Sequence, residues 1–341
     1  MDVMPTPYLI DPVVREGDPY ERIDPFFYNR LQLRPRIKPG NKLPDNFMAP
    51  AGAWSMPESV SVTSSVLEGP HGLIPIRTYR RIDAPPKAQL VWAHGGGFVE
   101  GDLDLPEAHA FCAEMAARAD LECISVEYHL VSRSEHHYPV ALDDIETVWR
   151  CTNYKECDSR SRIPRLVGGA SAGGNLAAAL CQRLIDNAER NQLPDGLILA
   201  YGVFHSMVPD NLMSIWSRNT DILPTPLRFS PEICHDMYAR YTGVDHNFPR
   251  YSMPGESTPV GFPPTAMVCC EFDDLARSSI RFAKQLSQVG VPVTCRMAVG
   301  VLHGFLNWYP VPELPQTLAT LDYFANFVDE ILSKHDSNFA Q

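Results

Sequence analysis

Positive charge is scarce in this sequence and is not concentrated anywhere along it. Lysine and arginine total 29 residues against 41 aspartates and glutamates, so the formal net charge at pH 7 is −12. A protein that binds nucleic acid neutralises phosphates with a basic face. The composition therefore excludes nucleic acid as the expected partner.

Long apolar runs are also absent. The first residues, MDVMPTPYLIDPVVREGD, contain acids and prolines where a secretory signal has a basic start and an unbroken apolar stretch. No later stretch approaches the ~20 apolar residues of a membrane-spanning helix. We therefore expect a cytoplasmic protein without a membrane span.

Cysteine is present, but not in the spacings that bind zinc. The nine cysteines are an odd number, and none belongs to a CxxC pair. A disulfide framework and a metal site therefore have little support. Cys269 and Cys270 are adjacent in a strand-like run, so we expect them to face opposite sides of a sheet. We interpret the cysteines as buried thiols in a reducing compartment.

The chain divides into regular and irregular regions. Hydrophobic residues make up 45% and charged residues 21% of the sequence, which is typical of a globular enzyme with a buried core. Two regions rich in proline and aromatic residues interrupt the pattern. We expect an N-terminal cap segment at 1–58, the first part of a core at 59–204, a cap insertion at 205–262 and the second part of the core at 263–341.

The regular regions predict an α/β fold. Alternating residues from Val60 onward indicate two antiparallel strands joined by a turn at Gly69 to Gly72. Apolar runs such as AQLVWAH and ECISVEYHL then alternate with helix-length segments such as EAHAFCAEMAARA. Apolar strands that alternate with amphipathic helices indicate a mostly parallel central sheet flanked by helices on both faces.

One serine lies in a G-x-S-x-G pattern between a predicted strand and an alanine-rich helix. In the stretch RLVGGASAGGNLAAAL, Ser171 has only glycine and alanine as neighbours. A nucleophile elbow needs small neighbours because the backbones crowd at a sharp strand-to-helix turn. The helix that follows directs its first N–H groups toward developing negative charge. The alternative is a glycine-rich turn with an idle serine.

Three consecutive glycines follow another strand, in the stretch LVWAHGGGFVEGD. Glycines allow backbone N–H groups to approach an oxyanion without side chains in the way. The N–H groups of Gly96 and Gly97, together with that of Ala172, are predicted to form an oxyanion hole with three donors. A phosphate-binding loop is the alternative, but the sequence lacks both the Lys-Ser/Thr ending and the dinucleotide spacing.

A serine nucleophile requires a base and a group that orients the base. Enzymes with a nucleophile elbow carry these groups in the chain order serine, acid, histidine, each in a loop after a late strand. CCEFDDLAR ends one strand at Asp273 and Asp274, and MAVGVLHGF ends the next at His303. We predict that His303 is the base and Asp273 the acid. Asp274 is the alternative acid, although we expect it to cap the helix that starts near Ala276.

The motifs HGGG, GASAGG, EFDDLA and LHGF, in that order, resemble the hormone-sensitive-lipase-like family of α/β-hydrolase carboxylesterases. The resemblance covers about residues 60 to 330. It implies an α/β-hydrolase fold with a helical cap built from the N-terminus and the insertion. It also implies Ser171 as nucleophile, His303 as base and Asp273 as acid, with a homodimer as the family-based expectation for oligomeric state.

The chain departs from this family at two places. Ala170 precedes the serine, where the family commonly carries an acidic residue. The family's usual YRLAPE tract reads YHLVSR at 128–133, with extra residues before Tyr138 and Pro139. Both departures concern the surroundings of the pocket, and neither removes a member of the triad.

The predicted reaction is acyl transfer from a small-molecule ester through an acyl-enzyme on Ser171, with no metal and no cofactor. A roofed pocket favours short- to medium-chain acyl or aryl esters. Aromatic residues are the candidates to line it, although most of them are expected only to pack the cap. These candidates are Phe98, Trp216, Phe229, Tyr238, Tyr241, Phe248, Tyr251, Phe262 and Phe305.

Two alternatives to an esterase stay open at this stage. An amidase, lactonase or thioesterase uses the same triad on a different acyl compound. A receptor-like binding module reuses the fold and the glycine-rich loop without the catalytic histidine. His303 is retained in this chain, which favours an enzyme.

Overall fold

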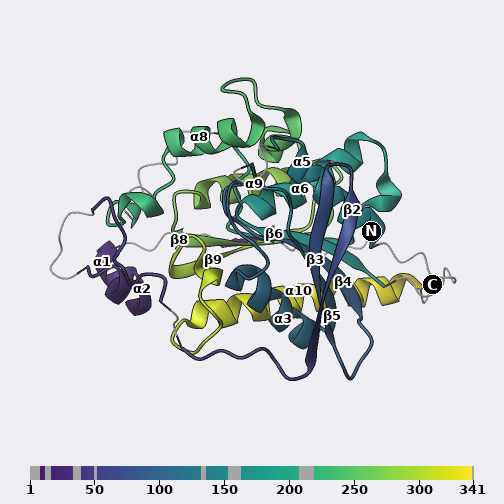
Figure 1. The fold of residues 1–341 in the computed structure, drawn as a ribbon, viewed down its shortest axis with the longest axis horizontal. Helices are drawn as coiled ribbons and strands as arrows, with labels where there is room; N and C mark the ends of the chain where they lie inside the picture. The colour runs from purple at the N-terminus through teal and green to yellow at the C-terminus, as the bar shows by residue number, and fades with distance from the viewer. Residues whose placement is uncertain are drawn as a thin grey trace.

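In a computed structural model of the protein, the strands of the described residues form one nine-stranded sheet at the centre of the fold (Figure 1). The structure describes residues 8–11, 17–33, 40–49, 52–131, 136–152, 163–206 and 219–339. The strands are β1 (Tyr8–Asp11), β2 (Val60–Gly69), β3 (Gly72–Arg81), β4 (Ala88–Ala93), β5 (Leu121–Val126), β6 (Arg165–Ala170), β7 (Gly196–Ala200), β8 (Thr265–Phe272) and β9 (Val293–Leu302). Their order in the sheet is β1-β9-β8-β7-β6-β4-β5-β3-β2.

The pairing of the strands is mostly parallel. Every neighbouring pair from β5 across to β1 is parallel. The hairpin of β2 and β3 is antiparallel and pairs Gly69 with Gly72, as the sequence predicts, and β3 then runs antiparallel to β5. The predicted α/β fold with a mostly parallel sheet is confirmed.

Helices cover both faces of the sheet. The α-helices of the described residues are α1 (Pro19–Arg22), α2 (Pro25–Arg30), α3 (Pro106–Ala119), α5 (Val140–Cys151), α6 (Ala172–Asp186), α8 (Pro231–Thr242), α9 (Ala276–Gln288) and α10 (Pro315–Phe339). Figure 1 shows α3 and α10 on one face and α5, α6 and α9 on the other. Among the helices of the described ranges, none is both long enough and apolar enough to cross a lipid bilayer.

The two faces of the sheet bury two separate apolar clusters. Cys269 packs in the cluster under α5, α6 and α9, whereas Cys270 packs in the cluster under α3 and α10. Strands β4 to β8 are buried at every position because helices cover them on both sides. The predicted opposite facing of the two adjacent cysteines is therefore confirmed.

The strand register brings several loops together at the carboxyl edge of the sheet. Ala93 lies opposite Gly169, so the glycine-rich loop after β4 begins beside the end of β6. Between β8 and β9 the register shifts, because Cys270 pairs with Ala298 while Phe272 pairs with Leu302. This irregularity makes the residues that follow β8 and β9 neighbours at the same edge.

The N-terminal segment is fastened to this edge by a buried ion pair. Arg22 Nη1 lies 2.7 Å from Glu271 Oε1, and the Glu271 side chain is fully buried. The second carboxylate oxygen, Glu271 Oε2, accepts a 2.8 Å hydrogen bond from Gly300 N. Asp24 N in turn donates to Gly300 O. The segment that carries α1 and α2 is thus tied to both β8 and β9.

Replacement of Arg22 by methionine is expected to lower the free energy of unfolding by about 3 kcal/mol, because it removes the positive charge beside the buried Glu271 carboxylate. Lys87→Met is the matched control. Lys87 pairs with Asp120 at the surface, so its loss is expected to change stability little. Urea denaturation of both variants measures the difference, and equal losses would contradict the anchoring role of Arg22.

Candidate active site

The turn between β6 and α6 holds Ser171 in a strained backbone conformation. Its φ is 50° and its ψ is −116°, a region that residues other than glycine rarely adopt. The turn also crosses the end of β4 closely, because a Cβ atom at Gly173 would lie 2.1 Å from Ala93 O. The second glycine of the G-x-S-x-G pattern is therefore required by the approach of the two backbones.

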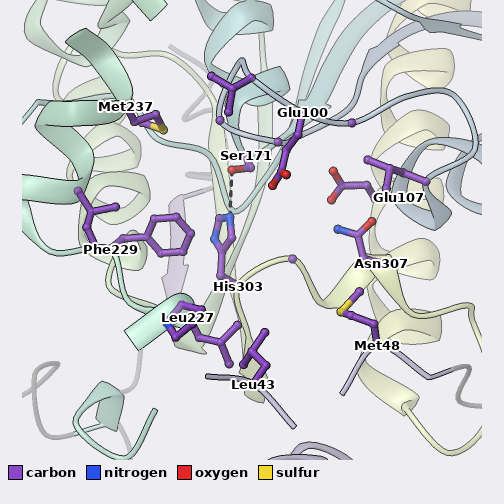
Figure 2. A pocket seen from close by; sticks show the side chains of 18 of the residues that line it. Leu43, Met48, Glu100, Glu107, Ser171, Leu227, Phe229, Met237, His303 and Asn307 are labelled. Atoms are coloured by element: carbon purple, nitrogen blue, oxygen red, sulfur yellow. Dashed lines mark hydrogen bonds between the residues drawn. The ribbon is translucent and has the colours of Figure 1, made fainter. Parts of the chain in front are cut away.

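The loops after β8 and β9 bring an acid and a histidine to the serine. His303 Nε2 lies 2.9 Å from Ser171 Oγ, the contact drawn as a dashed line in Figure 2. His303 Nδ1 lies 2.8 Å from Asp273 Oδ2. Asp273 is fully buried and Ser171 is 8% exposed. The three residues predicted from the sequence thus form one continuous hydrogen-bonded chain that ends at the serine.

The charge of Asp273 controls the protonation of His303. Burial acts to lower the pKa of His303, since a charged imidazolium is poorly solvated there. The negative charge of Asp273 and its hydrogen bond act in the opposite direction and prevail, so the pKa of His303 is raised above its ordinary value. The arrangement stabilises the imidazolium that forms when the histidine takes a proton.

The two adjacent aspartates have different partners. Asp273 uses its other oxygen, Oδ1, to accept from Leu275 N. The Asp274 carboxylate accepts from Thr220 Oγ1, Arg228 Nε and Phe229 N. The expectation that Asp274 caps the helix near Ala276 is wrong, because no side chain caps α9 and Asp274 instead binds the segment 220–229. These contacts hold the pKa of Asp274 below its usual value although burial acts to raise it.

The glycine-rich loop lies against the serine turn, because a Cβ atom at Gly95 would lie 3.1 Å from Ser171 Cβ. Gly96 and Gly97 have φ angles of 107° and 60°, and both residues line the same cavity as Ser171 and His303. The hydroxyl of Tyr128 donates to the carbonyl oxygens of residues 94 and 95, at 3.0 and 3.2 Å. The helix α6 begins at Ala172, so the N–H of Ala172 has no partner within the helix. The three predicted oxyanion donors thus lie around the serine.

A buried glutamate that the sequence analysis missed contacts this loop. Glu107 in the first turn of α3 is 2% exposed. Its Oε1 accepts from Gly95 N at 2.6 Å, and its Oε2 accepts from Tyr201 Oη at 2.6 Å. Burial raises the pKa of Glu107, against the effect of these hydrogen bonds. The sequence does not reveal this role of Glu107, because an acid in the first turn of a helix is ordinarily explained by its favourable interaction with the helix dipole.

A cavity of about 730 Å³ opens in front of Ser171. Residues of the N-terminal segment and of the region around α8, together with a tryptophan after β9, form most of its apolar wall, as Figure 2 shows for several of them. These apolar residues are Leu43, Phe47, Met48, Leu227, Phe229, Ile233, Met237 and Trp308. The apolar wall of the cavity thus combines segments that lie far apart in the sequence.

The structure places three of the predicted substrate-binding residues in the core rather than along this cavity. Phe98 stacks on Tyr241, with ring centroids 3.8 Å apart. Tyr238 is fully buried, and its hydroxyl lies near Asn175 and Val203 O. Phe305 is buried in the cluster under α3 and α10. Each of these rings is buried among neighbouring side chains and therefore does not face the substrate cavity. Trp216 lies outside the described residues.

The charged residues of the cavity wall are mainly acidic. Glu100, Asp102, Glu107 and Asp236 line it, with Arg240 as the positively charged residue among the described lining positions. Glu100 points toward Ser171 in Figure 2. An apolar cavity with an acidic wall favours neutral or cationic molecules over anionic ones.

Fold and site together define a serine hydrolase, and comparisons with known proteins agree. A family model described as the alpha/beta hydrolase fold matches residues 90–307. That stretch contains the glycine-rich loop, the serine, the aspartate and the histidine. The chain belongs to this alpha/beta-hydrolase family and is a hydrolase.

Individual relatives support the same family. Carboxylic ester hydrolase LipN of Mycobacterium tuberculosis is 30% identical over 254 residues, which are 73% of this chain and 65% of LipN. Esterase LipI of the same organism is 30% identical over 258 residues, 72% of this chain and 75% of LipI. The chain thus spans just under two thirds of LipN.

A solved structure shows the shared fold. Brefeldin A esterase, described as a bacterial homologue of human hormone sensitive lipase, aligns with a TM-score of 0.74 at 19% identity, over 92% of this chain and 95% of that chain. The α/β-hydrolase family that the resemblance of the motifs implied is confirmed by the family model and by these relatives.

Asp273→Asn is expected to lower kcat by about 10⁴-fold, because the amide no longer holds the imidazole in the correct tautomer. Asp274→Asn is expected to raise KM with a loss in kcat of less than about tenfold, since Asp274 binds the segment 220–229 rather than His303. Steady-state kinetics of the two variants separate these roles. A larger loss of kcat in Asp274→Asn would identify Asp274 as the acid.

The pH dependence follows from the raised pKa of His303. Protonated His303 cannot accept the serine proton, so kcat/KM is expected to fall as the pH drops through this pKa, which lies above the ordinary value of about 6.5. In Asp273→Asn the burial remains and the charge is gone, so the residual activity is expected to persist to lower pH. Profiles of kcat/KM between about pH 5 and pH 9 test this shift. An unchanged midpoint in the variant would contradict it.

Proposed function

We propose that this protein is a serine carboxylesterase that acts on short- to medium-chain acyl or aryl esters. The observation that carries the proposal is the continuous hydrogen-bonded chain from Asp273 through His303 to Ser171, which ends in an apolar cavity. The names of LipN and LipI, a carboxylic ester hydrolase and an esterase, support the same activity.

The first half of the reaction forms an acyl-enzyme. Ser171 Oγ attacks the ester carbonyl while its proton passes to His303 Nε2. The carbonyl oxygen becomes an oxyanion, which the N–H groups of Gly96, Gly97 and Ala172 stabilise. When the tetrahedral intermediate collapses, the ester C–O bond breaks and His303 gives its proton to the departing alkoxide.

The second half returns the enzyme to its starting state. A water molecule attacks the acyl carbon, and His303 takes one of its protons. The carboxylic acid product leaves, and the proton returns from His303 to Ser171. Asp273 keeps its charge throughout and stabilises the imidazolium in both halves.

The proposed substrate class follows from the cavity. Its volume of about 730 Å³ holds a small or medium ester, and its apolar wall favours an acyl chain or an aromatic ring. We assign the wall to a cap built from segments 1–58 and 205–262, with the core at 59–204 and 263–341. The acidic residues of the wall favour neutral or cationic esters. A cytoplasmic location and a homodimer stay predictions.

The test is hydrolysis of p-nitrophenyl esters from acetate to palmitate by the wild type and Ser171→Ala. The wild type is expected to turn over short and medium chains best, and Ser171→Ala to lose at least about 10³-fold in kcat with its fold intact by circular dichroism. The hemisuccinate ester, which is anionic, is expected to react about tenfold more slowly than the butyrate at low salt.

Full activity in Ser171→Ala would overturn the proposal. No turnover of any ester by the folded wild type would instead favour an amidase, a lactonase or a binding module. Equal rates for hemisuccinate and butyrate would contradict only the assignment of the acidic wall to substrate selection.

A further inference from the structure

We propose that Glu107 is a positioning residue, whose carboxylate holds the glycine-rich loop in the conformation that presents its N–H groups to the oxyanion. This inference rests on the proposed function, because the loop matters only if an oxyanion forms there. Glu107 Oε1 accepts from Gly95 N, and Oε2 accepts from Tyr201 Oη, both at 2.6 Å.

The hydrogen bond from Gly95 N to Glu107 Oε1 holds the residue that directly precedes the two predicted donors, Gly96 and Gly97. The side chain of Glu107 is 2% exposed, so water does not compete for Gly95 N. A Cβ atom at Gly95 would lie 2.6 Å from Glu107 Oε1 and 3.1 Å from Ser171 Cβ. Glycine at position 95 thus makes room for the carboxylate and for the serine turn at the same time.

A second contact restrains the loop from another direction. Tyr128 Oη donates to the carbonyl oxygens of residues 94 and 95, while Glu107 accepts from the N–H of Gly95. The carbonyl of residue 94 and the N–H of Gly95 belong to one peptide group, and each is held by a buried side chain. A peptide plane fixed in this way cannot rotate, so the orientation of the next N–H groups is set before substrate binds.

The helix α3 and the ring of Tyr201 hold Glu107 itself. Glu107 lies in the first turn of α3, whose apolar residues pack under the sheet. Tyr201 is fully buried, with its ring edge-on to His303 at a centroid distance of 5.1 Å. The same tyrosine thus borders the imidazole and anchors the glutamate. Figure 2 shows Glu107 with Asn307 beside it at the wall of the cavity.

Three variants separate the contacts of Glu107 from its charge. Glu107→Gln keeps both contacts, because the amide oxygen accepts from Gly95 N and the amide nitrogen donates to the tyrosine oxygen. Glu107→Ala removes both contacts. Tyr201→Phe keeps the ring and removes only the anchor of the glutamate. Glu122→Gln is the matched control, since Glu122 is equally buried and binds Gln89 at the other end of the sheet.

The first measurement is the kinetics of the four variants on a short p-nitrophenyl ester. Glu107→Ala is expected to lose about 10- to 100-fold in kcat with KM changed less than about threefold, because a displaced loop weakens only the transition state. Glu107→Gln is expected to stay within about threefold of wild type, and Tyr201→Phe to lose about three- to tenfold. Glu122→Gln is expected to keep its kcat.

The second measurement is the affinity for a trifluoromethyl ketone. Serine addition to its carbonyl forms a hemiketal oxyanion, so its binding requires the oriented loop. Glu107→Ala is expected to weaken it by the same factor as kcat/KM. The matching methyl ketone, which binds without adduct formation, is expected to bind equally to wild type and variant.

Specific results would overturn the inference. A folded Glu107→Ala enzyme with wild-type kcat, or with unchanged trifluoromethyl ketone affinity, contradicts it. Loss in Glu107→Gln equal to that in Glu107→Ala also contradicts it, because charge rather than the contact would then be required. If Glu107→Ala does not fold, Tyr201→Phe with unchanged kcat contradicts it in the same way. Absence of serine-dependent turnover in the wild type is a failure of the proposed function instead.

Discussion

The register of the parallel strands is the constraint on which the site depends. Parallel strands end at the same edge of a sheet, and their neighbours lie only about 5 Å apart. Phe272 pairs with Leu302, so Asp273 and His303 follow as adjacent residues of two adjacent strands. Ala93 pairs with Gly169, which places the glycine-rich loop beside the serine turn. The hydrogen bonds of the site form because backbone pairing has already brought their donors and acceptors within reach.

The end of β8 and the loop after it connect this chemistry to the wall of the cavity. Glu271 binds Arg22 of the N-terminal segment, Asp273 binds His303, and Asp274 binds Arg228 of the region before α8. Three carboxylates within four residues thus fasten the two covering segments and orient the base. The acid and both covering segments are therefore held by one short piece of backbone.

Local patterns were sufficient to predict much of this arrangement. The strand and helix alternation indicated the sheet, and the motifs around Ser171 and His303 indicated the residues that the structure brings together. The register shift between β8 and β9 could not be predicted, because it depends on long-range pairing. Nor could Glu107, whose partners Gly95 and Tyr201 lie 12 and 94 positions away. The carboxylate that binds the glycine-rich loop is that of Glu107 in α3. It does not come from position 170, beside the serine, because that residue is alanine in this chain. Of the aromatic residues chosen by type alone, Phe229 lines the cavity, whereas Phe98, Tyr238 and Phe305 are core residues, since burial and substrate contact favour the same side chains.

The central claim is that Ser171 is an activated nucleophile, and covalent labelling tests it most directly. The folded wild type is treated with a fluorophosphonate, which loses fluoride as the serine oxygen forms a bond to phosphorus, and the modified peptide is identified by mass spectrometry. The account predicts one adduct per chain, located on Ser171, with labelling that becomes slow when the protein is unfolded or when His303 is replaced by alanine. A folded protein that is not labelled, or that is labelled at another residue, would contradict it.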